Sequence, residues 1–165
     1  MSRIITTTPP FVLMFNHLFE PHSLPNFPAA QKKYGCSMWF QNKADASVLS
    51  EALEEEGQRF FGVGQSFNTY LKSGYAPYES WYQVSARSIR KPLLRVHLVE
   101  DLCHIAERGS IRNGDSCIAE VAPAAFEAYG HKGVVLELLS LTKIEESPVS
   151  EEQAALLTLK EQEGL

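Results

Sequence analysis

The sequence contains no apolar run of about 18 residues or more, the length that a transmembrane helix needs. The stretch M-S-R-I-I-T-T-T-P-P at its start lacks the long apolar segment of a secretory signal peptide. Both absences argue against membrane insertion and export. We therefore expect a cytoplasmic protein without a membrane partner.

Cysteine is scarce and widely spaced. The three cysteines, Cys36, Cys103 and Cys117, include no C-x-x-C pair, so neither a disulfide framework nor a zinc site is evident, and we expect buried free thiols. The five histidines also lack the spacing of a metal-binding motif. The sequence predicts no metal and no other cofactor.

Motifs for catalysis are missing as well. Gly62 and Gly64 lack the third glycine of a dinucleotide-binding fingerprint, and no phosphate-binding loop or G-x-S-x-G motif is present. The acidic run at 54–56 is typical of a solvated helix face, because a general acid and a general base need different environments. We therefore expect no catalytic residues, and a protein that is not an enzyme.

Acidic residues are absent from two segments that contain several cations. Residues 21–44 and 80–99 have lysines or arginines but no Asp or Glu. The net charge of −5 comes entirely from residues 145–165, which hold six glutamates and one lysine. Such segregation can give a protein of low pI a positive surface, so the composition does not exclude a nucleic-acid partner. The acidic tail itself is the other candidate for covering that surface.

Hydrophobic periodicity predicts a mainly β protein with one confident helix. The expected strands are 11–20, 31–42, 81–90, 116–122 and 133–144, and the helix is 45–60, capped by Asp45 or Ser47 and ended near Gly57 or Gly62. A helix between the second and third of five strands predicts a Greek-key OB-fold barrel with one capping helix over residues 1–144, followed by an acidic tail, 145–165. A two-sheet sandwich is the alternative.

Two tryptophans lie on strand faces that are otherwise polar. Trp39 shares a face with Lys33, and Trp81 shares one with Arg87. Exposed rings beside cations are what a single nucleic-acid strand needs, because bases stack on the rings while the cations follow the phosphates. Burial of both rings under a loop or the helix is the competing interpretation. A basic run at 87–91 and an aromatic and basic hairpin at 126–133 add weaker support.

The order of several short motifs resembles a family of bacteriophage single-stranded-DNA-binding proteins related to that of the T-odd coliphages. The motifs are L-F-E-P at the end of the first strand, K-Y opening the second, the acidic helix, R-K-P after the third, the Tyr129 hairpin and the last strand from Lys132 to Lys143. The stretch 92–108 departs from the pattern, since it is more apolar than the polar turn expected there.

The resemblance implies an OB-fold and sequence-independent binding of single-stranded DNA during phage DNA replication or recombination, in the cytoplasm of an infected bacterium. It also implies replication proteins as partners of the acidic tail, and a homodimer is a further expectation. The candidate DNA-binding residues are Lys33, Tyr34, Trp39, Trp81, Tyr82, Arg87, Arg90, Lys91, Tyr129 and Lys132. The alternative function is a β-rich phage structural or assembly protein with a protein-binding surface.

Overall fold

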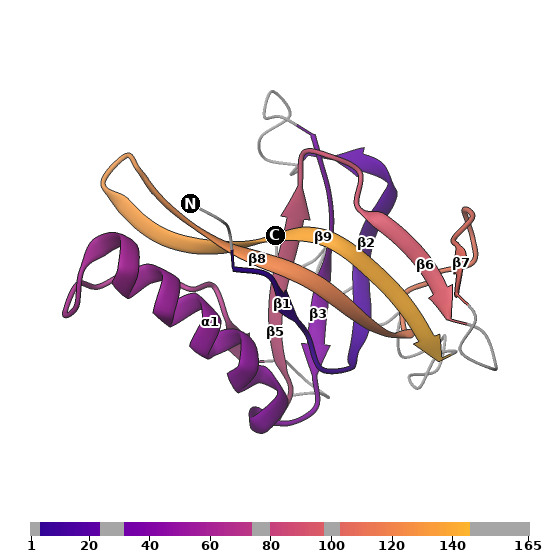
Figure 1. Ribbon diagram of the computed structural model, residues 1–165, viewed down its shortest axis with the longest axis horizontal. Coiled ribbons are helices and arrows are strands. Elements are labelled where there is room, and N and C mark those ends of the chain that lie inside the picture. Colours follow the sequence, from indigo (N-terminus) through magenta and orange to yellow (C-terminus); the bar gives the residue numbers. More distant parts are fainter. Residues whose placement is uncertain (1–3, 24–31, 74–79, 98–102, 146–165) are drawn as a thin grey trace.

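The computed structural model describes residues 4–23, 32–73, 80–97 and 103–145 (Figure 1). Its strands are β1 (Thr6–Thr7), β2 (Phe11–His22), β3 (Lys33–Phe40), β4 (Lys72–Ser73), β5 (Tyr82–Ser88), β6 (Leu93–His97), β7 (Cys103–Ile105), β8 (Ser116–Ala128) and β9 (His131–Glu145), and its helix is α1 (Lys43–Phe61). Apart from Glu145, the predicted acidic tail lies outside the described residues.

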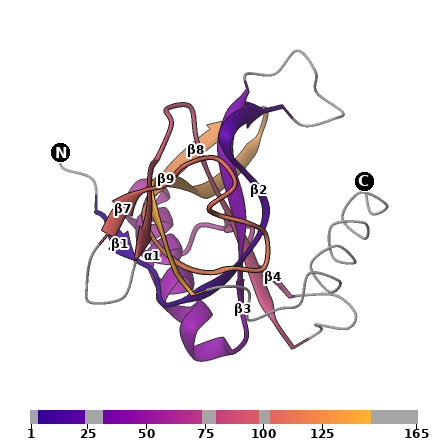
Figure 2. The ribbon, with the colours of Figure 1, turned by 90° about the vertical axis from the view of Figure 1, so that its right-hand side faces the viewer.

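Five of these strands close into a barrel. β2 pairs with β3, β3 with β5, β5 with β9, β9 with β8, and β8 again with β2; all these pairs are antiparallel except β5–β9. In Figure 2, β2 and β3 lie on one side of the barrel and β8 and β9 on the other. A ring in the order first, second, third, fifth, fourth strand is the Greek-key arrangement of an OB-fold. The predicted fold class is therefore confirmed.

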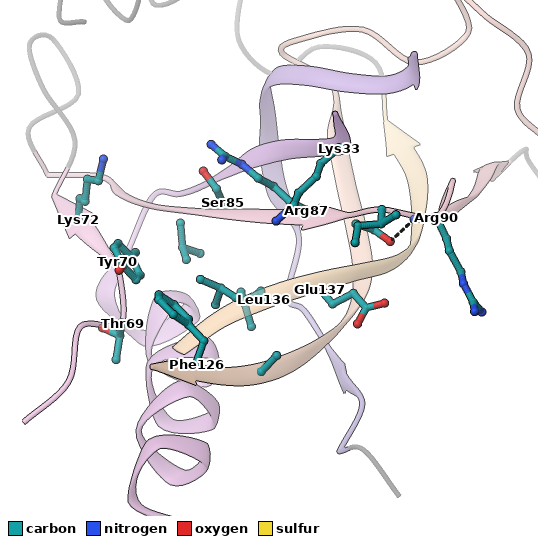
Figure 3. Close-up of a pocket in the computed structure, with 15 residues that line it drawn as sticks. Lys33, Thr69, Tyr70, Lys72, Ser85, Arg87, Arg90, Phe126, Leu136 and Glu137 are labelled. Atoms are coloured by element: carbon teal, nitrogen blue, oxygen red, sulfur yellow. Dashed lines mark hydrogen bonds between the residues drawn. The ribbon is translucent and has the colours of Figure 1, made fainter. Parts of the chain in front are cut away.

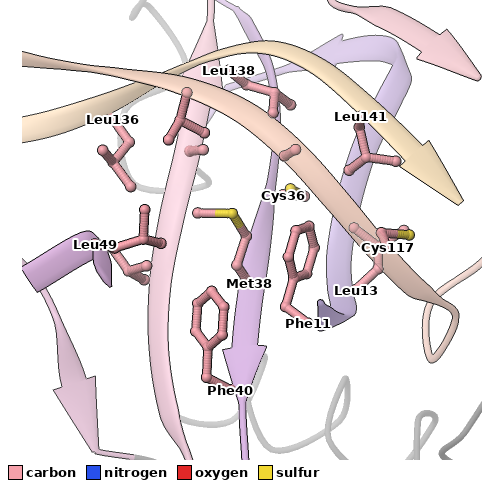
Figure 4. Packing of buried hydrophobic residues seen from close by; sticks show 14 of the residues in the cluster. Phe11, Leu13, Cys36, Met38, Phe40, Leu49, Cys117, Leu136, Leu138 and Leu141 are labelled. Atoms are coloured by element: carbon pink, nitrogen blue, oxygen red, sulfur yellow. The ribbon is translucent and has the colours of Figure 1, made fainter. Parts of the chain in front are cut away.

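The barrel interior is filled by the apolar face of each strand. Phe11 and Leu13 on β2 meet Cys36, Met38 and Phe40 on β3, and leucines of β9 close the interior (Figure 4). The three residues of β3 alternate along the strand, so they share the face that points into the barrel. Cys36 and Cys117 are buried free thiols, as expected. Burial raises the pKa of the Cys36 thiol to about 12, which keeps it protonated and unreactive.

The helix begins earlier than predicted. Its N-cap is Asn42, whose Oδ1 accepts a hydrogen bond from the backbone N–H of Asp45 at 2.9 Å, so the expected caps Asp45 and Ser47 are wrong. The helix ends at Phe61 and is capped by Gly62, where φ is +101°. This is one of the two endings that the sequence predicts. Leu49 and Leu53 are buried and pack the helix against the barrel beneath the β8–β9 hairpin (Figure 1).

Two features extend the barrel. β6 and β7 arise from the apolar stretch 92–108 and add to the edge of β9, a pairing that the sequence analysis did not predict. β8 and β9 continue beyond the barrel as a long hairpin. The two residues at its tip, Tyr129 and Gly130, have φ of +52° and +79°, the signature of a type I′ turn.

Candidate nucleic-acid interface

A groove of about 950 Å³ runs along β5 (Figure 3). Its floor is formed by β5, and its walls come from Lys33 of β3, the segment from Thr69 to Lys72, and the facing strands of the β8–β9 hairpin. The groove therefore lies over the second and third strands of the barrel and against the hairpin between its fourth and fifth strands. Most of these residues belong to strands that are paired in the sheet.

Positive charge predominates along the groove. Four cations line it, namely Lys33, Lys72, Arg87 and Arg90, against one carboxylate, Glu137. Strand alternation places Ser85 and Arg87 on the exposed face of β5 while Val84 and Ala86 are buried. The excess of cations gives the groove a field that attracts an anionic chain.

An aromatic pair lies at one end of the groove, and Arg90 lies toward the other (Figure 3). The rings of Tyr70 and Phe126 are 6.3 Å apart between centroids, with 15° between their planes. This near-parallel geometry is within the range of offset stacking. Tyr70 remains 38% exposed, so the pair offers a flat surface to a ligand in the groove.

The position of Tyr70 is fixed by its neighbour Asn68. The Asn68 backbone N–H donates to the carbonyl of Lys132 at 3.0 Å, and its own carbonyl accepts from Val134 N–H at 2.9 Å. Its side-chain oxygen then accepts from the Tyr70 N–H at 2.8 Å, which supports the positive φ of +58° at Tyr70. These bonds bind the loop after α1 to the hairpin strand β9.

Gly133 provides the space for the aromatic pair. A Cβ atom at this position would lie 2.7 Å from the Phe126 ring and 3.0 Å from the Tyr70 ring. Any side chain would therefore displace both rings. The stacked pair of Tyr70 and Phe126, the stacking platform, therefore depends on a glycine at this backbone position.

The arginines are also held by local structure. After β5, the hydroxyl of Ser88 accepts a hydrogen bond from the Arg90 N–H at 3.2 Å, which turns the chain at the end of the groove (Figure 3). Gly35 is paired with Arg87 on the neighbouring strand, and an added Cβ would come 2.8 Å from the Arg87 Cγ. The Arg87 side chain therefore lies over the glycine.

The prediction that Trp39 is exposed is wrong. The residue is only 1% exposed and packs with Val12 and Met14 of β2, with Phe15 and Trp81 at the border of the cluster. Trp39 lies opposite Val12 in the sheet, and the apolar side chains around it on this face cover the ring. The competing interpretation, burial of the ring, is correct for Trp39.

Three other predicted aromatic residues are half-buried and do not line the groove. Trp81 borders the Trp39 cluster, and Tyr82 packs against the main core. Tyr34 lies opposite Ser88 on the strand face that carries Cys36. Their contact with DNA remains a prediction.

The predicted cations and the hairpin tyrosine divide into two groups. Lys33, Arg87 and Arg90 line the groove together. Lys91 lies 5.5 Å from the centre of the Phe19 ring, and Lys132 lies 5.7 Å from that of Phe61, both outside the groove. Tyr129 is fully exposed at the hairpin tip and is also outside it.

Sequence reasoning missed Tyr70 and Lys72 and gave Phe126 only a supporting role. The sequence signal that could have identified Tyr70 is its place two residues after Asn68, because an asparagine side chain often accepts a hydrogen bond from the backbone N–H two residues later.

In the described ranges, no helix is long and apolar enough to cross a membrane. The same ranges hold no group of three His, Cys, Asp or Glu side chains arranged for a metal ion.

No protein-family model matches the chain, and no curated protein sequence matches it significantly. Several solved structures do align with the chain. The single-stranded-DNA-binding protein of bacteriophage Enc34 in complex with ssDNA aligns with a TM-score of 0.72 at 17% identity, over 87% of each chain. Gp2.5, the single-stranded-DNA-binding protein of bacteriophage T7, aligns with a TM-score of 0.58 at 10% identity, over 93% of this chain and 94% of that one. The chain therefore has the fold of these phage proteins.

Proposed function

We propose that this protein binds single-stranded DNA in the groove along β5, without sequence preference. The observation that carries the proposal is the combination of a stacked pair, Tyr70 and Phe126, with four cations in one groove. The groove lies over the barrel strands and hairpin with which OB-folds bind oligonucleotides. Two proteins with this fold are described as single-stranded-DNA-binding proteins, which supports the proposal.

The two kinds of side chain have separate roles. Lys33, Lys72, Arg87 and Arg90 neutralise phosphates and release counterions, which gives affinity without sequence information. Tyr70 and Phe126 stack bases, at about 1 to 3 kcal/mol for each base. Because every base has a flat π face, stacking accepts any sequence. Paired bases are not available for stacking, so the groove favours a single strand over a duplex.

The hairpin extends the binding path. Tyr129 at its tip and Lys132, two pairs from the tip, contact nucleotides that leave the groove at the aromatic end, and Lys91 contacts a phosphate beyond Arg90. The full exposure of Tyr129 supports this part of the proposal. The half-buried rings of Tyr34, Trp81 and Tyr82 make at most edge contacts.

The biological role follows from sequence-tolerant binding. Such a protein covers single strands during phage DNA replication or recombination in the cytoplasm of the infected cell, and it catalyses no reaction. A structural or assembly role is not favoured, since the two aligned structures are DNA-binding proteins.

The acidic tail competes with DNA for the groove. Residues 145–165 carry the whole net charge of −5, and a tethered anion acts at millimolar effective concentration. Truncation after Ile144 should tighten DNA binding several-fold at low salt, as anisotropy would measure. Unchanged affinity with loss of a homodimer in sedimentation would instead assign the tail to subunit contacts. Replication proteins are the other partners proposed for it.

The test of the proposed function is a salt titration of binding to an oligothymidylate of about 16 nucleotides, the upper end of an OB-fold site, and to a duplex of the same length. With four phosphates neutralised, log affinity for the single strand should fall with log salt at a slope of about −3. We expect the single strand to bind more than about tenfold more tightly than the duplex. Equal affinity for the two would show a basic patch and no stacking site.

A further inference from the structure

Two histidines of β2 lie together beside the groove. The rings of His17 and His22 are stacked, with centroids 4.2 Å apart and 9° between their planes. Both residues are exposed, and neither lines the groove. The register between β2 and β3 shifts on either side of His17, which bends β2 locally. His17 and His22, five positions apart, can therefore come together.

The stacked histidines adjoin two of the groove cations. In the sheet, His22 is opposite Lys33, and His17 is opposite Gly35, which is in turn opposite Arg87. The glycine has no side chain, and the Arg87 side chain lies over it. A row of potential cations therefore crosses from β5 over β3 to β2 on one face of the sheet.

Few acidic groups offset this charge among the described residues. Glu20, also on β2, is paired with Arg108. Glu137 is opposite Arg87 on β9, on the side of β5 away from the histidines. Among the described residues, the charged groups on the strands beside the pair are thus Lys33 of β3 and Arg87 of β5, both positive.

In the absence of an anion, the surroundings of His17 oppose protonation of its ring. Although the residue is exposed, partial desolvation of the ring lowers the pKa of His17 below its usual value, and the neighbouring His22 and Arg87 lower it further. Two stacked imidazolium rings would also repel each other. A phosphate placed between the pair and Arg87 would reverse the balance, because it favours the charged form of each ring.

We propose that His17 and His22 form a phosphate subsite that continues the groove across β3 and takes up a proton when a phosphodiester of single-stranded DNA occupies it. The proposal rests on the proposed function, which it deepens. Bound protein then holds more protons than free protein, so affinity rises as the pH falls and declines as the pH rises through the histidine range.

The experiment compares wild type with a His17→Gln/His22→Gln variant. Affinity for an oligothymidylate is measured by anisotropy between about pH 8 and about pH 6, where histidine titrates. Wild-type affinity should rise by about tenfold over this range, which corresponds to an average uptake of about half a proton on binding, and the double variant should change by less than about twofold. His104→Gln, at an exposed histidine on β7, a strand that pairs with β6 and lies outside the groove, is the matched control and should follow wild type.

A second variant and a second readout guard against a purely structural effect. His17→Lys/His22→Lys carries charge at every pH, so it should bind at about pH 8 nearly as tightly as wild type does at about pH 6. Calorimetry in two buffers of different ionisation enthalpy should show proton uptake by wild type alone. Equal pH dependence or equal proton uptake in wild type and the glutamine variant would overturn the subsite while leaving the groove intact. Absence of DNA binding at every pH would overturn the proposed function as well.

Discussion

The protein has two aromatic clusters close to β5, and only one of them is open to a ligand. Trp39 packs among Val12 and Met14 and is 1% exposed. Tyr70 and Phe126 stack at the mouth of a groove lined by cations. The comparison teaches that the neighbours of a ring determine its role: apolar neighbours on both sides make a core residue, whereas a groove and nearby cations make a stacking platform.

The largest effect should come from Trp39, and it should be an effect on stability. Trp39→Ala removes a fully buried ring and leaves a cavity, so we expect a loss of about 3 to 5 kcal/mol in the free energy of unfolding, measured in urea. The DNA affinity of the folded fraction should stay close to wild type. Trp39→Phe, which retains most of the packing, is the control. A large loss of affinity in Trp39→Phe with unchanged stability would return the stacking role to this residue.

For the exposed pair of Tyr70 and Phe126, we expect substitution to lower DNA affinity and to leave stability nearly unchanged. Tyr70→Ala should weaken binding of oligothymidylate by about 1 to 3 kcal/mol at every salt concentration, since it removes a stacking partner and no charge. Its stability should change little because Tyr70 is exposed. Phe60→Ala, which removes an exposed ring outside the groove, is the matched control.

Gly133→Ala disturbs the same platform without removing a ring or a charge, because the new Cβ would clash with both rings. DNA affinity should fall in parallel with that of Tyr70→Ala. If affinity in both variants equals that of wild type, the pair is not the stacking site.

The smallest effect should come from single cations. Arg90→Ala should reduce the slope of log affinity against log salt by about 0.7, the contribution of one phosphate on a single strand. Arg59→Ala, which removes an arginine of α1 that is paired with Glu56 and lies outside the groove, is the control and should leave the slope unchanged. An equal change of slope in the two variants would show that charge acts through the net field and that position in the groove is unimportant.

Much of the fold was predictable from the sequence because it depends on local patterns. Hydrophobic periodicity predicts the five barrel strands and the helix, and Gly62 marks the end of the helix. The extra strands β6 and β7 were not predicted, since their pairing with β9 depends on tertiary contacts over an apolar stretch.

The candidate site was predictable only in part. Lys33, Arg87 and Arg90 follow from alternation within a strand, and the groove contains all three. Alternation also assigned Trp39 to an open face, because it cannot show that both faces of β3 are covered. Tyr70 and Phe126 meet through bonds between Asn68 and the distant strand β9, which no local pattern of residues reveals.

The most direct test of the central claim is an amide NMR titration of the 18.5 kDa protein with oligothymidylate. We expect large shifts at the amides of residues 69–72, 85–90 and 133–137, together with little change at Val12, Met14 and the indole N–H of Trp39. Shifts concentrated on the Trp39 cluster, with the amides around Tyr70 and Phe126 unmoved, would contradict the assignment of DNA to the groove along β5.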